Sequence, residues 1–579
     1  MNPSGGELIA DILRAHGVRF LFTLTGGHIA PILVGCHHRG IRVVDVRDEV
    51  NAVFAADAVA RLTGIPGVAA VTAGPGVTNT ITALKNAQMA QSPLILLGGA
   101  AATLIRGRGS LQDIDQISLL KSVVKMAVTI NRNCDIAPAM EHAFQTARSG
   151  VPGPVFVECP IDLLYSEKLV REWYGAKSRE SGGNDIKSKL FQFYMNRHVN
   201  NLFACDLNEV KTRPRGCSFP EVKTGHIIKA EKILEGAHRP VLIVGSQAML
   251  EPSQSGRLLS SLERMAIPVF LAGMARGVMG KSHHLQMRHH RKEALKKADV
   301  VVIAGMPCDF RLGYGMAINS RATLIAINRS KADLMLNRKP ELAVHADPAQ
   351  FLAALAERFV PGGRSRDWTA SLRSSDDDRE NEIRKMAEMK TDGVHPLRLL
   401  TRLEDFLTDE SILVADGGDF VATASYVLRP RAPLSWLDPG VFGTLGVGAG
   451  FATGAKLCRP DAEVWLIYGD GAAGYSLQEF DTFVRHGLPV IAVVGNDAAW
   501  AQIAREQIEL FHNEIATVLR RSDYHTVAAG FGGMGILVTR EEEIQPALES
   551  ARHHAREGIP VLINVHIGKT DFRKGSISM

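Results

Sequence analysis

The sequence predicts an α/β protein with three doubly wound parallel-sheet domains, and three observations lead to this prediction. Short runs of Val, Ile and Leu alternate with helical patterns along most of the 579 residues. These runs lack polar alternation, as expected of parallel strands that are covered on both faces. Two polar stretches, 169–222 and 361–388, separate the runs into three groups, and the length suits three or four domains.

The first domain is placed at residues 1–168. Its helices are expected at 8–16 and 49–62, and its strands at 19–25, 41–46, 68–72 and 93–97. The segment that follows, 169–222, is a linker that contains a basic amphipathic stretch at 186–204. Such a stretch can lie on a membrane surface, but more often packs its apolar side on its own protein, and we favour the second interpretation.

The second domain is placed at residues 223–360 and the third, with a basic C-terminal tail, at 389–579. Apolar runs predict strands at 240–244, 268–271, 300–303 and 323–327 in the second, and at 412–415, 464–468, 490–494 and 561–565 in the third. The stretch between them, 361–388, contains Asp376-Asp377-Asp378 and is predicted to be a polar linker.

Charge and cysteine content exclude several classes of protein. A net charge of +5 is too small to indicate nucleic-acid binding, and no apolar run is long enough to span a bilayer. The seven cysteines are odd in number, scattered and without a CxxC pair, which indicates buried, reduced thiols rather than disulfides or a zinc site. The N-terminus is unlike a signal peptide, so a soluble cytoplasmic protein is expected.

Two strands of the third domain run into polar turns. One is followed by Gly469-Asp470-Gly471 and the other by Gly495, Asn496 and Asp497. Parallel strands bring their carboxyl ends to one edge of the sheet, where ligands bind in such folds. Carboxylate and amide oxygens at that edge suit a Mg²⁺ that anchors a diphosphate, with backbone amides near Gly471 facing a phosphate. The alternative, an ordinary turn beside an unrelated loop, is less favoured.

In the first domain, Glu49 follows a strand and opens an apolar helix, and Gly74-Pro75-Gly76 with Asn79 forms a second turn at a strand end. A glutamate there could simply complement the helix dipole. If it is buried, its pKa rises, and it could donate a proton to a ring nitrogen.

These motifs together resemble the thiamine-diphosphate-dependent enzymes of the acetolactate synthase superfamily over almost the whole chain. The matching segments include VRDEVNAVFAADAVAR at 46–61, TAGPGVTNT at 72–80, KNAQMAQSPLILLGGA at 85–100, DPGVFGTLGVGAGFATGAKL at 438–457 and NDAAWAQIAREQ at 496–507. The resemblance implies a pyrimidine-binding, a central and a diphosphate-binding domain in that order. It also implies a homodimer or homotetramer in which two subunits share each active site.

Site roles carried over from the resemblance begin with Glu49, which would protonate the pyrimidine ring and so generate the form that activates the thiazolium carbon. The cofactor-binding positions would be Glu49, Gly74, Asn79, Gly443, Leu445, Asp470, Gly471, Ala472, Asn496 and Asp497. Asp470 would bind Mg²⁺ together with Asn496 or Asp497. Charge beside a diphosphate slightly favours Asn496 over Asp497.

Other expectations concern the substrate and the central domain. His28 and Gln112 are the candidate catalytic residues near the reacting carbon, although His28 could equally be a structural histidine. Relatives bind FAD or ADP where this chain has Gly245-Ser246-Gln247, Arg276, Asn328 and Asp347, and the resemblance leaves open whether either binds.

The lyase branch of the superfamily is the most similar. Its reaction splits the C1–C2 bond of a 2-hydroxyacyl-CoA into an aldehyde and formyl-CoA, as in fatty-acid α-oxidation. A 2-oxoacid decarboxylase or carboligase of the acetolactate synthase type is the alternative. Members of the branch can carry a membrane anchor, so membrane association is implied by resemblance only.

Overall fold

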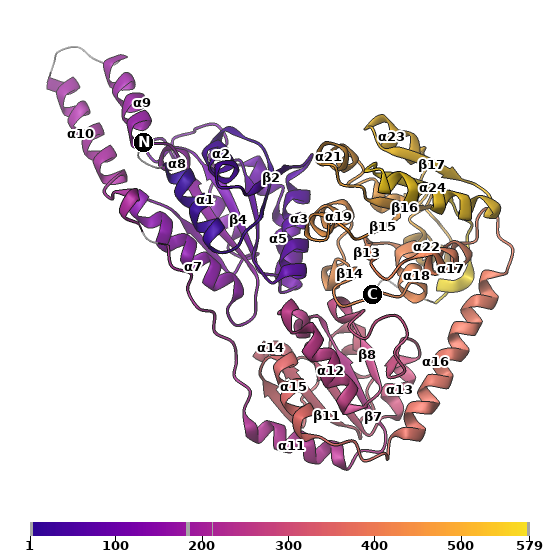
Figure 1. The fold of residues 1–579 in the computed structure, drawn as a ribbon. Helices are drawn as coiled ribbons and strands as arrows, with labels where there is room; N and C mark the ends of the chain where they lie inside the picture. Colours follow the sequence, from indigo (N-terminus) through magenta and orange to yellow (C-terminus); the bar gives the residue numbers. More distant parts are fainter. Residues whose placement is uncertain (1–3, 181–185, 211, 576–579) are drawn as a thin grey trace. The chain divides into compact units, whose positions relative to one another are not determined.

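The computed structural model describes residues 4–180, 186–210 and 212–575 and confirms the predicted fold class (Figure 1). Three six-stranded sheets account for the named strands, and every pair of neighbouring strands within them is parallel. The chain separates into two compact units, residues 1–60 with 65–217 and residues 61–64 with 218–579. Each unit is described by itself.

The sheet of the first unit has the strand order β2-β1-β3-β4-β6-β5. Its strands are β1 (Phe20–Leu24), β2 (Arg42–Asp45), β3 (Gly67–Val71), β4 (Leu94–Ala100), β5 (Met126–Thr129) and β6 (Pro154–Pro160). The longer helices are α1 (Gly5–Ala15), α2 (Ala30–His38), α3 (Glu49–Thr63), α5 (Ile81–Met89) and α7 (Ile136–Arg148). Helices α1, α2 and α7 cover one face of the sheet, and α3 and α5 cover the other (Figure 1).

This strand order creates a crevice at one edge of the sheet. The chain leaves β1 for β2 on one side and returns to β3 on the other. The loops after β1 and β3 therefore diverge, and open α/β sheets bind ligands at such a switch point. The central strands are buried throughout because helices cover both faces, which explains their unbroken apolar sequences.

Two helices follow the first sheet, α9 (Glu167–Glu180) and α10 (Ile186–Leu202). The prediction that the apolar side of α10 packs on its own protein is confirmed for Met195, Val199 and Leu202, which join the core of the first unit. It is wrong for the opposite side of the helix, where Leu190 and Tyr194 are 63% and 53% exposed. The 186–204 stretch is apolar on two sides, and its own domain covers one of them.

The prediction that all cysteines are reduced is wrong for one pair. Cys134 and Cys205 form a disulfide that joins the region before α7 to the end of the α10 segment. The two residues are separated by 71 positions, so no short sequence motif indicates that they pair. Cys36, Cys159 and Cys308 are buried as expected, and Cys217 and Cys458 are partly exposed.

The central sheet, in the second unit, has the order β12-β11-β10-β7-β8-β9. Its strands are β7 (Pro240–Val244), β8 (Val269–Leu271), β9 (Gln286–Met287), β10 (Val300–Ala304), β11 (Thr323–Asn328) and β12 (Leu342–His345). The helices around it are α11 (Thr224–Glu235), α12 (Ser255–Met265), α13 (Arg291–Lys297), α14 (Lys331–Leu334) and α15 (Pro348–Arg358).

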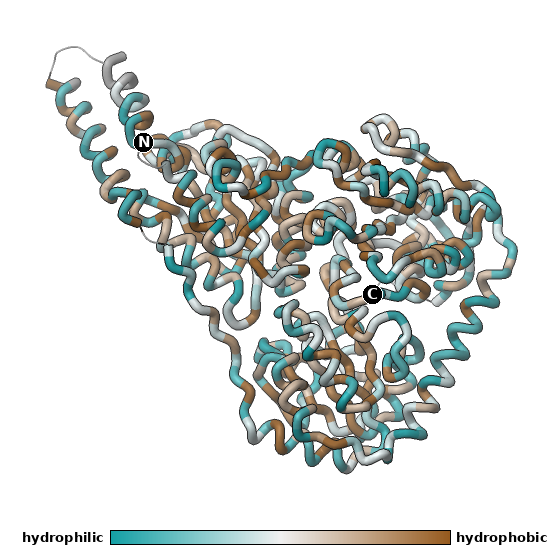
Figure 2. Tube along the Cα trace, viewed as in Figure 1, coloured by the Kyte–Doolittle hydropathy of each residue, from teal (hydrophilic) through white to brown (hydrophobic). Residues whose placement is uncertain are grey.

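The predicted polar linker at 361–388 is mostly a helix, α16 (Arg366–Ala387), and this corrects the expectation of an irregular segment. The acidic run looked like a solvated loop, but Asp376 is 1% exposed. Its carboxylate accepts hydrogen bonds from the backbone N–H groups of Arg288 and His289 at 2.7 and 2.6 Å. Most of α16 is hydrophilic, as the teal segments in Figure 2 show, while Leu372 and Ile383 are buried in the cores beside it.

The third sheet has the order β14-β13-β15-β16-β18-β17. Its strands are β13 (Ile412–Ala415), β14 (Trp436–Leu437), β15 (Val464–Gly469), β16 (Ile491–Asn496), β17 (Met534–Val538) and β18 (Val561–His566). The accompanying helices are α17 (Pro396–Phe406), α18 (Asp419–Val427), α19 (Gly448–Cys458), α20 (Asp470–Ala473), α21 (Glu479–His486), α22 (Ala501–Phe511), α23 (Tyr524–Gly530) and α24 (Ile544–Arg556). The switch point of this sheet lies between β13 and β15.

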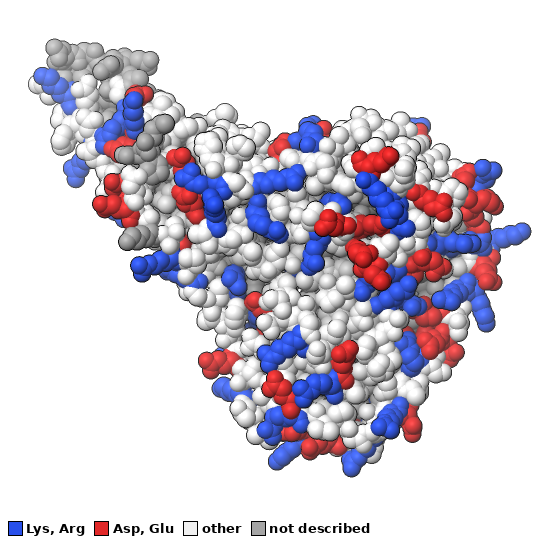
Figure 3. Space-filling view, in the orientation of Figure 1, with Lys and Arg blue, Asp and Glu red and all other residues white. Residues whose placement is uncertain are grey.

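The surface matches the composition. Basic and acidic side chains are interspersed over the face shown in Figure 3. Within the described ranges, no helix is both long and apolar enough to cross a membrane. The end of the basic tail, residues 576–579, lies outside the described residues.

Candidate active site

The residues predicted to face the pyrimidine meet at the carboxyl edge of the first sheet. Glu49 begins α3 directly after β2 and is 7% exposed. The side-chain amide of Asn79 donates to Glu49 Oε2 at 3.0 Å. Glu49 Oε1 lies beside Gly76, where an added Cβ would stand 3.4 Å from it. The structure thus places a buried carboxylate with one oxygen fixed by Asn79 and the other beside a residue without a side chain.

His28 lies at the same edge, in the turn η1 (Gly27–Ile29) after β1. Its Nδ1 is 3.0 Å from Thr72 Oγ1, at the end of β3. Burial lowers the pKa of His28, so the ring is neutral at pH 7. A neutral ring can accept a proton through one nitrogen and donate through the other.

Gly74 and Gln112 are also neighbours. Gly74 has a φ of +64°, and a Cβ there would stand 2.7 Å from the carbonyl oxygen of Gln112. The N–H of Gly74 donates to Gln116 Oε1 at 2.9 Å, and Gln116 in turn donates to Glu158 Oε1 at 2.9 Å. Gln116 is buried and positions this turn, a role that the sequence did not reveal. All five residues predicted for this half of the site therefore gather around β1 and β3.

The diphosphate-side residues line a cavity of about 290 Å³ at the carboxyl edge of the third sheet. Six of the predicted cofactor residues line it: Gly443, Leu445, Asp470, Gly471, Ala472 and Asp497. Residues from the turn after β13, such as Asp419, and from the start of α22 complete the wall.

Asp470 and Asp497 give this cavity its electrostatic character. Asp470 is 3% exposed, and its Oδ1 accepts the N–H of Gly471 at 2.8 Å. Its buried Oδ2 has no hydrogen-bond partner among the residues that the structure describes. Burial raises the pKa of Asp470 to about 6. Burial and the charge of Asp470 raise the pKa of Asp497 to about 7. An unsatisfied carboxylate oxygen and two neighbouring carboxylates suit Mg²⁺, which takes one or two protein carboxylates and completes its shell with phosphate oxygens.

Asn496 is directed elsewhere. It ends β16, is fully buried, and donates through Nδ2 to Asn564 Oδ1 of β18 at 3.2 Å and to the carbonyl of Ser522 at 3.3 Å. The cavity lining includes Asp497 rather than Asn496. The cavity lining favours Asp497, but Asn496 Oδ1, the atom that could bind a metal, is buried without a hydrogen-bond partner among the described residues, so the choice between the two ligands stays a prediction.

Trp500 was not predicted. It precedes α22, and a Cβ on Gly471 would lie 2.3 Å from its ring. Glycine is therefore required at Gly471 if the ring is to stay in place against the turn.

Asp416 was not predicted either. It follows β13 and is 2% exposed. Its Oδ1 accepts the N–H of Gly446 at 2.9 Å and its Oδ2 accepts the N–H of Gly448 at 2.7 Å. Burial raises the pKa of Asp416 to about 7. These bonds fasten the turn that carries Leu445 to the end of β13, so Asp416 positions one wall of the cavity.

Comparison with known proteins places the chain in a family. Sequence models of thiamine pyrophosphate enzymes match in all three parts: the N-terminal TPP binding domain at residues 3–119, the central domain at 227–355 and the C-terminal TPP binding domain at 416–565. The chain belongs to the thiamine pyrophosphate enzyme family.

Similar relatives cover nearly the full length of this thiamine pyrophosphate enzyme. The 2-hydroxyacyl-CoA lyase 2 of Danio rerio is 49% identical over 99% of this chain and 93% of its own. The Homo sapiens protein of the same name is 50% identical over 99% of this chain and 92% of its own. A probable acetolactate synthase of Mycobacterium bovis is 35% identical over 97% of this chain and 95% of its own.

In the central domain of this thiamine pyrophosphate enzyme, Gln247, Asn328 and Asp347 of the predicted nucleotide residues are hydrogen-bonded to other protein groups. Gln247 donates to Asn328 Oδ1 at 2.9 Å and accepts the N–H of Arg329 at 2.6 Å. Asp347 pairs with Arg329 and accepts the N–H of Gln350, which starts α15. The side chains of Gln247, Asn328 and Asp347 therefore form hydrogen bonds within the protein.

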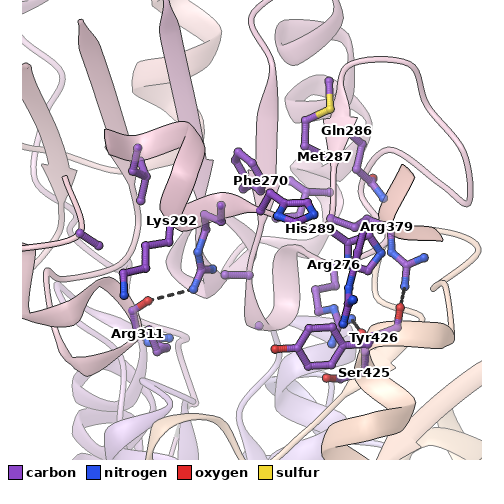
Figure 4. A pocket seen from close by; sticks show the side chains of 18 of the residues that line it. Phe270, Arg276, Gln286, Met287, His289, Lys292, Arg311, Arg379, Ser425 and Tyr426 are labelled. Atoms are coloured by element: carbon purple, nitrogen blue, oxygen red, sulfur yellow. Dashed lines mark hydrogen bonds between the residues drawn. The ribbon is translucent and has the colours of Figure 1, made fainter. Parts of the chain in front are cut away.

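Arg276, in contrast, lines a separate cavity of about 810 Å³ in the second unit. Figure 4 shows it beside Ser425 and Tyr426 of α18, and its guanidinium donates to the carbonyl of Ser425 at 2.5 Å. The cationic side chains in the lining are Arg276, Arg288, Arg291, Lys292, Arg311 and Arg379. Burial and the neighbouring Arg288 lower the pKa of Arg276 to about 10.

Proposed function

We propose that this chain is a thiamine-diphosphate-dependent lyase that cleaves the C1–C2 bond of a 2-hydroxyacyl-CoA into an aldehyde and formyl-CoA. The observation that carries the proposal is that the chain is about half identical, over nearly its full length, to proteins named 2-hydroxyacyl-CoA lyase 2, and the grouping of the predicted cofactor residues supports it. The pyrimidine half is built around Glu49 and the diphosphate half around Asp470.

Glu49 is proposed to hold the proton at a ring nitrogen of the aminopyrimidine. Asn79 fixes Oε2, and the absence of a side chain at Gly76 leaves room beside Oε1. When bound, thiamine diphosphate supplies the carbon that adds to the thioester carbonyl and the ring that takes up the electron pair of the broken bond. His28, neutral at pH 7, is proposed to pass protons on the substrate side, and Gln112, which lies against Gly74, is the second candidate there.

The diphosphate end is proposed to be held by Asp470 and Asp497 through Mg²⁺, and by the amides of Gly471 and Ala472. The carbonyl of Gly443 would accept the exocyclic amine of the pyrimidine, and Leu445 would support the bent cofactor from below. Asp416 keeps both residues in place through Gly446 and Gly448.

The active molecule is proposed to be a homodimer or homotetramer. Glu49 lies in the first unit and Asp470 in the second. In the superfamily that this chain resembles, the two halves of one site come from two subunits. A sedimentation measurement of the cofactor-loaded enzyme distinguishes these states from a monomer.

The cationic cavity is proposed to hold a nucleotide diphosphate, ADP or FAD. Desolvation lowers the pKa of Arg276 and Arg288, the charge of Arg288 adds to the lowering at Arg276, and a phosphate would stabilise both cations. Chromatography of the supernatant from heat-denatured enzyme identifies any bound nucleotide. Added ADP or FAD should raise the thermal stability of the wild type but not of an Arg276→Ala variant.

The lyase activity is tested with purified enzyme, thiamine diphosphate and Mg²⁺, compared with a Glu49→Gln variant. A 2-hydroxyacyl-CoA and pyruvate are offered separately, and aldehyde, formyl-CoA and carbon dioxide are followed. Aldehyde with formyl-CoA, strongly reduced in the variant, is the expected result. Carbon dioxide from pyruvate alone would identify the synthase-type alternative, and no turnover of either would contradict an enzymatic role.

A further inference from the structure

The α9–α10 hairpin presents large apolar side chains to solvent. Ile186, Leu190 and Phe193 are 78%, 63% and 66% exposed. Phe191 and Tyr194 beside them are 42% and 53% exposed. In Figure 1 the two helices extend together away from the first sheet. Large apolar side chains grouped on one element mark an interaction surface more often than isolated ones do.

The exposed set and the buried set occupy opposite sides of α10. Ile186, Leu190 and Phe193 each precede a core residue, Met195, Val199 or Leu202, by nine positions. Nine residues make two and a half turns of an α-helix, so each pair points in opposite directions. The exposed stripe therefore does not face the core of the first unit.

The base of the hairpin is firmly held. Tyr174 donates to Asp162 Oδ2 at 2.8 Å, and His198 Nε2 lies 3.0 Å from Thr103 Oγ1. The disulfide between Cys134 and Cys205 ties the segment after α10 to the domain. The stripe is thus carried on a fixed element.

We propose that this stripe, Ile186, Leu190, Phe193 and Tyr194, docks the protein on an anionic lipid surface. Residues 186–205 contain Lys187, Lys189 and Arg197 and no acidic residue. Basic residues beside Phe, Tyr and Leu are the composition of helices that lie in the headgroup region of a bilayer. Figure 3 shows basic and uncharged atoms along the outer part of α10.

The size of the stripe favours a lipid surface over a second folded chain. A fully exposed aromatic side chain offers about 150–250 Å². Four side chains that are 53–78% exposed therefore offer about 500 Å² at most on that scale, below the roughly 800 Å² that each partner buries in a stable protein interface. A bilayer needs no complementary shape, and a narrow helix can enter it alone.

The test is co-sedimentation of the full-length protein with phosphatidylcholine vesicles, prepared with and without phosphatidylserine. Wild type should bind the phosphatidylserine vesicles, and Phe193→Glu should reduce the bound fraction at least about tenfold. Gln192→Glu is the matched control, since it adds the same charge at an exposed position on another side of α10 and should bind as wild type does. Leu190→Glu should repeat the loss if Phe193→Glu does not fold.

Light scattering without lipid separates the remaining possibilities. The proposal expects the same particle mass for wild type and Phe193→Glu. A smaller mass for the variant would assign the stripe to a second copy of the chain and overturn the proposal. Failure of wild type to bind either vesicle, equal binding by Phe193→Glu, or equal binding to both vesicle types would overturn it as well.

Discussion

Replacing Asp416 with asparagine should stabilise the protein at alkaline pH and at the same time impair catalysis. The carboxylate is buried and accepts the N–H groups of Gly446 and Gly448 through separate oxygens. These bonds hold the turn that carries Leu445 into the cofactor cavity. The asparagine amide keeps the shape but loses the charge and one of the two acceptor oxygens.

The magnitude follows from the pKa of Asp416, which burial raises from 3.8 to about 7. Each pKa unit corresponds to about 1.4 kcal/mol, so the ionised group disfavours the folded state by about 4 kcal/mol above pH 7. Because the folded pKa is the higher one, this group's contribution to stability is fully present below pH 3.8 and is lost as the pH rises through 7. About 3 kcal/mol of the loss falls between pH 5 and pH 8.

Asparagine avoids this loss but leaves one buried N–H without its acceptor, which costs about 1–3 kcal/mol. The variant should therefore be more stable than wild type at pH 8, by about 1–3 kcal/mol, and equal or less stable at pH 5. Displacement of the turn by a fraction of an ångström should lower kcat about 10–100-fold, because small errors in positioning are costly in catalysis.

The assay is thermal unfolding of both proteins at pH 5 and pH 8, together with kcat at saturating cofactor. Asp409→Asn makes the same chemical change at an exposed position of the same domain and should alter neither quantity. A stability difference between Asp416→Asn and wild type that is the same at both pH values would refute the argument from the buried charge. Wild-type kcat in the variant would refute the positioning role.

Three further predictions concern the two halves of the cofactor site. Glu49→Gln should lower kcat about 10²–10⁴-fold with thiamine diphosphate binding and thermal stability retained, as measured by aldehyde release and calorimetry. Affinity for Mg²⁺ should fall about 20-fold from pH 8 to pH 6, because burial raises the pKa of Asp497 to about 7 and of Asp470 to about 6, and protons then compete with Mg²⁺ for both carboxylates. A Mg²⁺ affinity that titration calorimetry finds independent of pH would contradict this prediction. Gly471→Ala should weaken cofactor binding at least about tenfold because its methyl group would meet Trp500, whereas Gly474→Ala in the same turn, with its nearest contact at 3.4 Å, should bind normally.

The strands were the most predictable part of the fold. The apolar runs at β7 and β13 have the predicted bounds. A strand covered by helices on both faces is apolar along its whole length, so its ends coincide with the ends of the apolar run. The edge strand β5 was missed because all four of its residues are only partly buried and its sequence lacks such a run. The helix α16 was missed because its polar residues are satisfied by partners far along the chain, such as Arg288 for Asp376.

The sequence predicted those site residues that belong to a short motif at the end of a strand. A strand followed by Gly-Asp-Gly, or by Glu at a helix start, indicates a ligand edge from the sequence itself. The sequence did not predict Asp416, Gln116 and Trp500, because no short motif encodes the contacts that define their roles. Asp416 contacts Gly448, Gln116 contacts Gly74, and Trp500 lies against Gly471.

The identity of the second metal ligand shows most clearly what sequence leaves open. A shift of one residue along a strand moves a side chain to the opposite face, so Asn496 and Asp497 cannot both reach the cavity in the same way. In the structure, Asn496 Nδ2 donates to Asn564 of β18, a partner 68 positions away, while Asn496 Oδ1 has no partner among the described residues and Asp497 lines the cavity.

The two side chains should therefore respond differently to removal. Asn496→Ala should destabilise the protein by about 1–3 kcal/mol, because it removes the amide that donates to the buried Oδ1 of Asn564. Asp497→Ala should weaken Mg²⁺ binding at least about tenfold with little loss of stability, because its carboxylate is disfavoured in the metal-free protein. Unfolding and Mg²⁺ titration of both variants decide between them, and loss of Mg²⁺ binding confined to Asn496→Ala would reassign the ligand.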